Sequence, residues 1–563
     1  MQKKILTVIC SALILTSAGC NAAGQHENTD TGSTSAADSS LTEISRDTSL
    51  VSETASTSES TDDVPTTNTS AGYEEKIFGK DVLEISITTE EANWQNLMDN
   101  AGDKPWIECD ITIDGVTFKD VGIKTKGNTS LQQLVKDEST RYSLKVNFGK
   151  YTEGQTCYGL DKLALNNIYA DSTYLKEYMS YDLMRFMQVP SSLCTFANIT
   201  VNGEHYGFFL AVENADDSYL ERIYGSDSNV KGYKPEAMDM AGQPDRKNMP
   251  QMSGQDGNTQ RPDFPDGDSS GFPQRPDFPD GDSSGFPQRP DGGNMPQMPG
   301  QGGMPGGMDG GRNGVDLTYI DDAPESYSNI FDNHINKIEE EDQQRLIASL
   351  KNISNGEKLE ESINVDEVLR YTACNVFLVN LDSYLSSNCH NYILTELNGQ
   401  LSMLPWDYNL SFGTYQCKSA DDAVNYAIDT VFNGVNEEER PLIAKLLAKE
   451  EYREKYHQYL REIAEKYVQS GKFAETVEKV SSVINDYVKT DSTSFDGYDA
   501  YVEGIDTLKQ LMELRTQSVL GQLDGTIPST AEEQTNSDKL IDASSVDLKK
   551  LGTMNMGGGF PAR

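Results

Sequence analysis

Asp382, Asn388, Asn391 and Asp407 lie close together in the sequence of this chain. Asp382 and Asn391 precede a predicted β-hairpin, in which two apolar runs flank an Asn-Gly turn, and Asp407 follows the hairpin directly. Phosphoryl transfer needs a carboxylate that orients the attacking hydroxyl, and it needs oxygen ligands that hold magnesium on a triphosphate. The spacing predicts this chemistry, with Asp382 as the base and Asp407 as a metal ligand. On spacing alone, two unrelated acids beside an ordinary hairpin are the alternative.

Several motifs resemble those of the spore coat protein H (CotH-type) kinases, which are atypical, secreted or surface-exposed relatives of protein kinases. The hairpin region contains the Asn-Leu-Asp that ends at Asp382, the Asn-Tyr that begins at Asn391 and the Leu-Pro-Trp-Asp that ends at Asp407. Three upstream segments are similar to family motifs in the same order, namely KTKGNTS at 124–130, YSLK at 142–145 and NGEHYGFFLAVE at 202–213. The resemblance extends over most of residues 82–523.

The resemblance implies an α+β, two-lobed protein-kinase-like fold with a strand-rich N-lobe and a helical C-lobe. It implies an enzyme that uses ATP with Mg²⁺ or Mn²⁺ and transfers the γ-phosphate to Ser or Thr of a surface or coat-like protein. It favours Asn391 as the second metal ligand, while Asn388 is an alternative because its spacing from Asp382 is closer to that of protein kinases. The family usually has a second Asp two residues after the Trp-Asp. This chain has Asn409 there, which leaves activity and metal preference open.

The strand-rich half is predicted to supply the nucleotide contacts. Lys145 lies on a predicted strand and would contact the phosphates, oriented by Glu177 of a helix predicted over 172–187. Alternatively, Lys145 is a solvated lysine of the strand and Glu177 is an exposed acid of the helix. Glu213 ends the last strand of this half, where the chain of a kinase passes the adenine. The loop at Gly127 and Asn128 is predicted to cover the phosphates through its backbone amides.

The first twenty residues have the layout of an export signal. Two lysines precede an apolar stretch at 5–15, and a Ser-Ala-Gly-Cys sequence ends at Cys20. A cysteine after Ala-Gly is typical of bacterial lipoproteins, so Cys20 is predicted to be lipidated and to anchor an extracytoplasmic protein to the membrane. A plain secretory signal with an incidental cysteine is the alternative.

Charge and cysteine content limit the partners and the covalent bonds. The net charge of −42 argues against a nucleic-acid partner, because phosphate backbones are bound by basic surfaces. The cysteines after Cys20 permit disulfides in an oxidising compartment, and isolated buried thiols agree equally well with their spacing.

Composition divides the chain into segments. A perfect tandem repeat, RPDFPDGDSSGFPQ at 261–274 and 275–288, lies inside a stretch dominated by Pro, Gly, Met and Asp, which predicts a disordered insertion. The predicted segments are a lipoprotein signal at 1–20, a disordered Ser/Thr-rich tether at 21–72, a kinase-like N-lobe and hinge at 73–234, the insertion at 235–314, a kinase-like C-lobe at 315–525 and a flexible tail at 526–563.

Two other functions compete with the kinase. A degenerate kinase fold that presents the insertion to a partner would act as a surface interaction or adhesion module, and Asn409 and the repeats favour this alternative. A weaker alternative is transfer of a phosphoryl or nucleotidyl group to a non-protein acceptor such as a glycan. The presence of Lys145, Asp382, Asn391 and Asp407 favours the enzyme.

Overall fold

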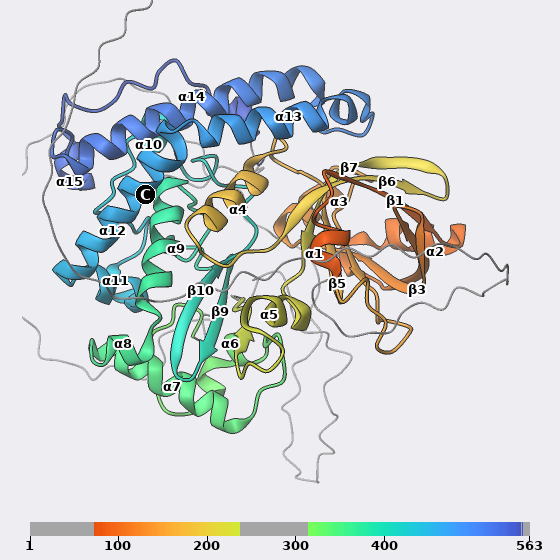
Figure 1. Cartoon of the computed structure of the whole chain (residues 1–563), viewed down its shortest axis with the longest axis horizontal. Helices are drawn as coiled ribbons and strands as arrows, with labels where there is room; N and C mark the ends of the chain where they lie inside the picture. Colours follow the sequence, from red (N-terminus) through yellow and green to blue (C-terminus); the bar gives the residue numbers. More distant parts are fainter. Residues whose placement is uncertain (1–71, 237–313, 553, 555–563) are drawn as a thin grey trace, which may run out of the picture. The chain divides into compact units, whose positions relative to one another are not determined.

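The computed structural model describes residues 72–236, 314–552 and 554, all within one unit that spans residues 66–563 (Figure 1). The predicted signal with Cys20, and almost all of the predicted tether and insertion, lie outside the described residues. Within the described ranges, no helix is both long and apolar enough to cross a bilayer.

Seven strands in the N-terminal half form a closed barrel with the order β1-β2-β3-β4-β5-β7-β6. Strands β6 and β1, at the two ends of this order, pair in parallel, with Val82 opposite Phe196 and Ile87 opposite Val201. The other neighbouring strands pair in antiparallel fashion. The barrel strands are β1 (Val82–Thr88), β2 (Ile107–Ile113), β3 (Val116–Thr125), β4 (Leu144–Asn147), β5 (Lys162–Asn166), β6 (Cys194–Val201) and β7 (Glu204–Glu213). The resemblance implied a strand-rich half, and the parallel β6–β1 pair closes its strands into a barrel.

Alternation along the strands gives the barrel a filled interior and a partly polar outer face. The interior is packed with Ile, Val, Leu and Phe side chains, such as Ile123, Leu144 and Leu165, which are all buried. The outer face of β3, β4, β5 and β7 carries rows of paired residues. One row runs from Lys124 through Lys145 and Ala164 to Val212.

Short helices surround the barrel, and one of them connects it to the helical half. They are α1 (Gly72–Lys76), α2 (Glu91–Asp99), α3 (Thr129–Lys136) and α4 (Lys176–Phe186). Helix α4 begins four residues later than predicted, because residues 171–175 form a turn in which Asp171 accepts hydrogen bonds from the backbone N–H groups of Thr173 and Lys176. It lies between the barrel and α9, in contact with β6 on one side and α9 on the other (Figure 1).

The predicted hairpin is present. Strands β9 (Tyr392–Leu397) and β10 (Gln400–Pro405) pair in antiparallel fashion, and β8 (Lys231–Tyr233) joins the outer edge of β9. Asn398 and Gly399 both have positive φ, at 53° and 92°, which the tight two-residue turn requires.

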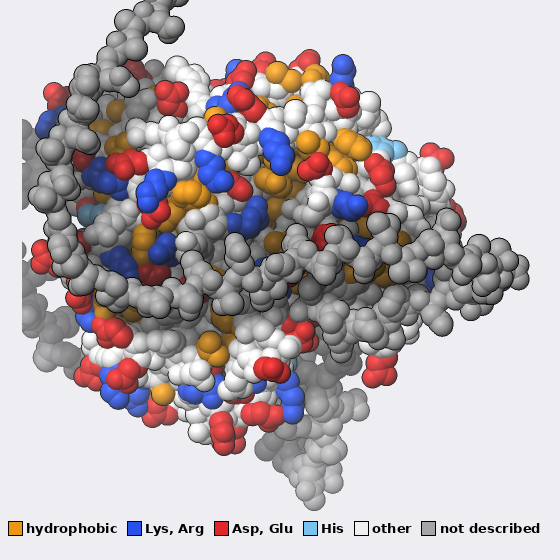
Figure 2. All heavy atoms as spheres, viewed as in Figure 1, with side chains coloured by type: hydrophobic (Ala, Val, Ile, Leu, Met, Phe, Trp, Pro, Cys, Tyr) orange, Lys and Arg blue, Asp and Glu red, His pale blue; other side chains and the backbone are white. Residues whose placement is uncertain are grey.

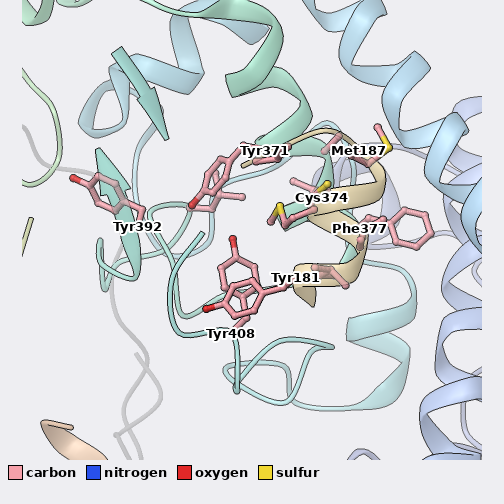
Figure 3. Packing of buried hydrophobic residues seen from close by; sticks show 14 of the residues in the cluster. Tyr181, Met187, Tyr371, Cys374, Phe377, Tyr392 and Tyr408 are labelled. Atoms are coloured by element: carbon pink, nitrogen blue, oxygen red, sulfur yellow. The ribbon is translucent and has the colours of Figure 1, made fainter. Parts of the chain in front are cut away.

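Helices form most of the described chain after residue 314. They are α6 (Ser328–Phe331), α7 (Glu340–Asn355), α8 (Leu359–Ser362), α9 (Val365–Phe377), α10 (Ala420–Val424), α11 (Pro441–Leu447), α12 (Glu450–Glu462), α13 (Lys472–Thr490), α14 (Gly497–Leu523) and α15 (Ala531–Gln534). Helix α5 (Asp217–Tyr224) precedes them, between β7 and β8. Figure 3 shows how Tyr181 of α4 and Met187, which directly follows α4, lie close to Cys374 and Phe377 of α9 in this core. Each such buried side chain contributes roughly 1.5–3 kcal/mol. The presence of both a strand barrel and a helical half confirms the predicted α+β class.

The segment after residue 525 is ordered through residue 552, so the prediction of a flexible tail is wrong there. The backbone N–H of Ala543 donates to Asp421 Oδ1 at 2.7 Å, and the carbonyl of Leu551 accepts from Ser172 N at 3.2 Å. Ala543 and Leu551 are fully buried. The six cysteines of the described chain are free thiols, and all but Cys417 are buried.

Candidate active site

A cavity lies where the outer face of the barrel meets α4 and the segment that follows the hairpin. Its walls include Lys126, Gly127, Asn166, Glu177 and Asp407, and its open space measures about 560 Å³. These residues come from four separate parts of the chain. The fold therefore brings the predicted Gly-Asn loop, helix acid and hairpin acid to one place.

Lys126, and not Lys145, is the lysine that the fold places beside Glu177. The Lys126 ammonium donates to Asn166 Oδ1 at 2.5 Å, and Asn166 Nδ2 donates to Glu177 Oε2 at 2.7 Å. Lys126 follows the end of β3, and Asn166 ends β5. The predicted pairing of Lys145 with Glu177 is corrected to a Lys126–Asn166–Glu177 chain.

Lys145 lies on the same outer face, one row farther along the barrel. It pairs with Lys124 and Ala164 across the strands, and it does not line the cavity. Burial and the positive charges of Lys162 and Lys234 lower the pKa of Lys145 to about 8, against the opposing effect of Asp216. Its surroundings are thus basic, whereas the surroundings of Lys126 contain two carboxylates.

The acids of the cavity are electrostatically coupled to Lys126. Burial and the charge of Asp407 raise the pKa of Glu177, and the Lys126 charge opposes this effect. Burial lowers the pKa of Lys126, whereas Asp407 and Glu177 raise it. Two carboxylates in a desolvated site around one ammonium group form a place where an additional cation is favoured.

Tyr181 connects the helix acid to the hairpin acid. Its hydroxyl donates to Glu177 Oε1 at 2.9 Å and accepts from the backbone N–H of Asp407 at 3.2 Å. Asp407 has a φ of 59°, a left-handed conformation that an ordinary residue adopts only where its surroundings hold it. Tyr181 is fully buried, and its ring lies 6.1 Å from that of Tyr408 (Figure 3). No motif in the sequence identified this residue.

We expect Tyr181→Phe to weaken both stability and phosphoryl transfer. The change removes the donor to Glu177 and the acceptor for Asp407 N–H in a buried site, which costs about 1–3 kcal/mol of unfolding free energy. We expect transfer to fall at least about tenfold, because the two acids are no longer held together. Tyr178→Phe on the same helix is the control, since the ring of Tyr178 stacks on Phe196 without a hydrogen bond of its hydroxyl in the described chain. Chemical denaturation and steady-state kinetics measure both effects, and equal behaviour of the two variants would contradict the prediction.

Asp382 lies in a loop that the structure organises around its carboxylate. Asp382 Oδ1 accepts from Asn388 Nδ2 at 2.7 Å and contacts His390 Nε2 at 2.9 Å, and Oδ2 accepts from Asn391 Nδ2 at 3.0 Å. Burial would lower the pKa of His390, but its hydrogen bond to Asp382 and the charges of Asp382 and Asp407 raise it. Sequence analysis missed His390, whose only signal was its position next to Asn391.

The Asp382 loop and the segment after Asp407 are held together through the backbone. The N–H of Phe412 donates to the carbonyl of Leu378 at 2.7 Å, and the N–H of Gly413 donates to that of Val379 at 3.2 Å. Leu378 and Val379, shortly before Asp382, therefore pair with Phe412 and Gly413, shortly after Asp407. This arrangement places the two predicted acids on neighbouring segments.

The side chains present suit a magnesium ion that shares its coordination with a triphosphate. Asn391 uses its amide nitrogen on Asp382, which leaves its amide oxygen to serve as a ligand together with the Asp407 carboxylate. Asn409 lines the cavity with a neutral amide, and its Nδ2 donates to Tyr169 O at 3.3 Å. No set of three His, Cys, Asp or Glu residues in the described chain forms a metal site by itself. Magnesium commonly takes one or two protein ligands and completes its octahedron with phosphate and water oxygens, so the donor set fits.

Glu213 does not face the cavity. Its carboxylate accepts from Arg222 at 2.8 and 2.5 Å and from the Tyr73 hydroxyl at 2.6 Å, and the side chain is fully buried. Strand alternation explains this placement, because Val212 faces outward and its neighbour Glu213 therefore points to the other side of the sheet. The predicted contact of Glu213 with the nucleotide is replaced by a structural ion pair.

The Gly-Asn loop borders the cavity as predicted. Gly127 lines the cavity with a φ of 110°, a conformation that disfavours other residues. Asn128 precedes α3, and its Oδ1 accepts from the ammonium of Lys104 at 2.8 Å. Asn128 thus contacts a lysine rather than the cavity itself.

One cavity on the outside of the barrel thus brings together a lysine, a buried helix acid and the acid that follows the hairpin. A family model described as CotH kinase protein matches residues 123–272 and 308–519, which is more than half of the chain. The chain therefore belongs to the CotH kinase family, and the resemblance seen in its motifs is confirmed. No curated protein matches the chain.

Proposed function

We propose that this protein is an ATP-dependent kinase that transfers the γ-phosphate to Ser or Thr hydroxyls of surface or coat-like proteins. The observation that carries the proposal is the convergence of Lys126, Glu177 and Asp407 on one cavity, beside the loop that holds Asp382. Phosphoryl transfer depends on positioned charge and on an in-line acceptor hydroxyl. The charged groups of the cavity support the first requirement, and a carboxylate that could orient the hydroxyl, that of Asp382, supports the second.

Each side chain has a distinct role in this proposal. Lys126 binds the phosphate oxygens and is oriented by Asn166 and Glu177, since a flexible lysine needs a fixed partner. Asp407 and the amide oxygen of Asn391 would hold a magnesium ion, which would neutralise charge on the triphosphate. Asp382 accepts the proton of the acceptor hydroxyl as the new O–P bond forms and the bond to the leaving ADP breaks.

We also propose the two-lobed arrangement of protein kinases for this fold. The barrel with α4 would serve as the N-lobe and the helices after residue 314 as the C-lobe, with the cavity at their junction. Protein kinases carry the phosphate-binding lysine on a strand and pair it with a helix glutamate. Here Asn166 contacts that glutamate from β5, and Lys126 supplies the ammonium.

The cellular location is part of the same proposal. The export signal and Cys20 support an extracytoplasmic lipoprotein that acts on protein substrates of the surface or envelope. The net charge of −42 supports protein acceptors over nucleic acids.

The proposal is tested by incorporation of labelled phosphate from ATP with Mg²⁺ or Mn²⁺, in the full chain and in single variants. We expect wild-type incorporation to be lost in Asp407→Ala and in Asp382→Ala, because one removes a metal ligand and the other removes the base. Asp227→Ala is the control, since Asp227 is an exposed loop acid. Retained transfer in both site variants would contradict the proposal.

A surface interaction module is the second candidate, and the neutral Asn409 in the cavity favours it. If the wild-type protein transfers no phosphate, nucleotide-dependent thermal stabilisation distinguishes a kinase from a surface interaction module. Stabilisation by ATP without transfer would indicate a missing substrate. Absence of both would favour the interaction module.

A further inference from the structure

Residues 541–552 pack on the segment that precedes α4. They lie after α15, and they end in a short 3₁₀ helix, Leu548–Leu551, that contacts α14 (Figure 1). Leu551 is fully buried, and its carbonyl accepts from the backbone N–H of Ser172 at 3.2 Å. We call residues 541–552 the strap.

Buried groups hold the strap on the helical half. The backbone N–H and carbonyl of Ile541 bond with the side-chain amide of Asn425 at 3.0 and 2.9 Å. Figure 2 shows side chains of both charges intermixed on the visible face of the protein. The pair of Lys550 with Glu503 is an exposed contact of this kind, and such pairs stabilise little. The strap therefore depends on its backbone hydrogen bonds and on buried side chains such as Leu551.

Two glycines allow the strap to approach its neighbours closely. A Cβ at Gly552 would lie 2.6 Å from the carbonyl oxygen of Ala170. A Cβ at Gly504 of α14 would lie 2.8 Å from the carbonyl oxygen of Lys550. The Ala170 carbonyl also accepts from the buried ammonium of Lys176, the first residue of α4, at 2.7 Å. The strap thus touches the carbonyl that binds the N-terminus of α4, with no room for a further carbon atom.

The segment that the strap contacts is strained, and it lines the cavity. Ile168, Ala170 and Tyr174 have φ values of 63°, 61° and 62°, a left-handed conformation that is unfavourable for ordinary residues and most of all for a β-branched one. Such conformations persist only where the surrounding structure holds them. Ile168 and Tyr174 lie in the cavity wall together with Tyr169 and Asp171. The strap therefore supports one wall of the cavity.

Helix α4 connects this strained segment to the rest of the site. The Lys176 ammonium donates to Thr414 Oγ1 at 3.0 Å, and the hydroxyl oxygens of Ser180 and Ser411 lie 3.0 Å apart. Thr414 and Ser411 both belong to the segment that follows the hairpin. A displacement of the N-terminus of α4 would therefore move Glu177, which directly follows Lys176, away from its partners in the cavity.

We propose that the strap positions α4 for phosphoryl transfer, with Leu551 and Gly552 as positioning residues. Protein kinases are active only when the contact between the phosphate-binding lysine and the helix glutamate is in place, so a displaced helix lowers activity. Release of the strap lets the strained segment relax while the core stays folded. The effect on transfer rests on the proposed kinase activity. The effect of the strap on α4 does not, and it is measured separately.

The test compares Gly552→Ala with the matched control Gly225→Ala, both in the full chain. The two glycines have nearly the same backbone conformation, with φ 90° and ψ 141° at Gly552 and φ 86° and ψ 151° at Gly225, so both variants carry similar backbone strain. A Cβ at Gly225 meets no atom of the described chain within 4 Å, whereas one at Gly552 collides with Ala170. We expect the KM for ATP to rise at least about fivefold and kcat to fall about tenfold in Gly552→Ala only.

The KM for ATP distinguishes positioning from a loss of folded protein. Partial unfolding lowers the rate through the amount of active enzyme and leaves the KM for ATP unchanged. Leu551→Ala removes a buried anchor of the strap without a collision, and it should raise the KM for ATP in the same direction. An unchanged KM for ATP in both Gly552→Ala and Leu551→Ala would overturn the inference.

Hydrogen exchange provides a measurement that needs neither ATP nor transfer. We expect the backbone amides of residues 170–186 to exchange at least about tenfold faster in Gly552→Ala than in the wild type, and at the wild-type rate in Gly225→Ala. This result together with no phosphoryl transfer by the wild-type protein would support the strap and count against the proposed kinase activity. Equal exchange of these amides in the two variants would overturn the inference.

Discussion

Lys126→Met is expected to reduce phosphoryl transfer about 10²–10³-fold, a loss typical of removing one positioned group that stabilises developing charge. The reason is its place in the site, where its ammonium contacts Asn166 and is coupled to the charges of Glu177 and Asp407. Lys145→Met should cost less than about tenfold, because Lys145 lies outside the cavity among other lysines. Steady-state kinetics with ATP and one acceptor measure both variants.

The position of the ammonium group gives this prediction a direct control. Asn166 lies on β5 with its side chain in contact with Glu177. The double variant Lys126→Met/Asn166→Lys returns a positive charge opposite Glu177 from that strand. We expect it to recover part of the lost activity, and Lys145→Met should keep the wild-type unfolding free energy within about 1 kcal/mol. A larger loss in Lys145→Met than in Lys126→Met would contradict the assignment.

Arg141→Met is expected to lower the free energy of unfolding by about 3–5 kcal/mol, because it leaves a buried carboxylate without its partner. The Arg141 guanidinium donates to Asp491 Oδ2 at 2.8 Å, to Phe208 O at 2.6 Å and to Asn167 O at 3.1 Å. Arg141 is 4% exposed, and the side chain of Asp491 is fully buried. One side chain thus connects the barrel to the segment between α13 and α14.

The same cluster supports the wall of the cavity. The ring of Phe495 lies 5.4 Å from the guanidinium carbon of Arg141 and 5.4 Å from the ring centroid of Tyr169, which lines the cavity. We therefore expect Arg141→Met to weaken ATP binding as well as stability.

Chemical denaturation measures the stability effect against a matched variant. Arg185→Met is the control, because the Arg185–Asp182 pair is partly exposed at 3.7 Å, and such pairs contribute about 0–1 kcal/mol. The double variant Arg141→Met/Asp491→Asn should regain part of the loss, since it removes the uncompensated charge. Equal destabilisation by Arg141→Met and Arg185→Met would contradict the prediction.

Local features of the fold were predictable from the sequence. The Asn-Gly turn and its apolar flanks predicted β9 and β10, because a two-residue turn and strand alternation depend on neighbouring residues only. The motifs around the hairpin likewise placed Asp382 and Asn391 before it and Asp407 directly after it. The order of the motifs was sufficient to indicate the family.

Contacts between distant segments decided the rest of the site. Alternation places Lys124, Lys126 and Lys145 on one face of the barrel, but only the packing of α4 against that face determines which lysine meets Glu177. Tyr181 acquires its role in the same way, since its partner Asp407 lies 226 residues away.

The errors have the same origin. The run GFFLAV before Glu213 is apolar throughout, so it did not reveal that Glu213 points away from the cavity toward Arg222. The segment after residue 525 has the polar composition of a tail, yet a few apolar anchors such as Ala543 and Leu551 order it on α10, α14 and the loop before α4. The sequence by itself determined the local elements, the motifs and the family. The tertiary structure decided which charged groups meet, because strand alternation leaves several residues on one face and only long-range packing selects among them.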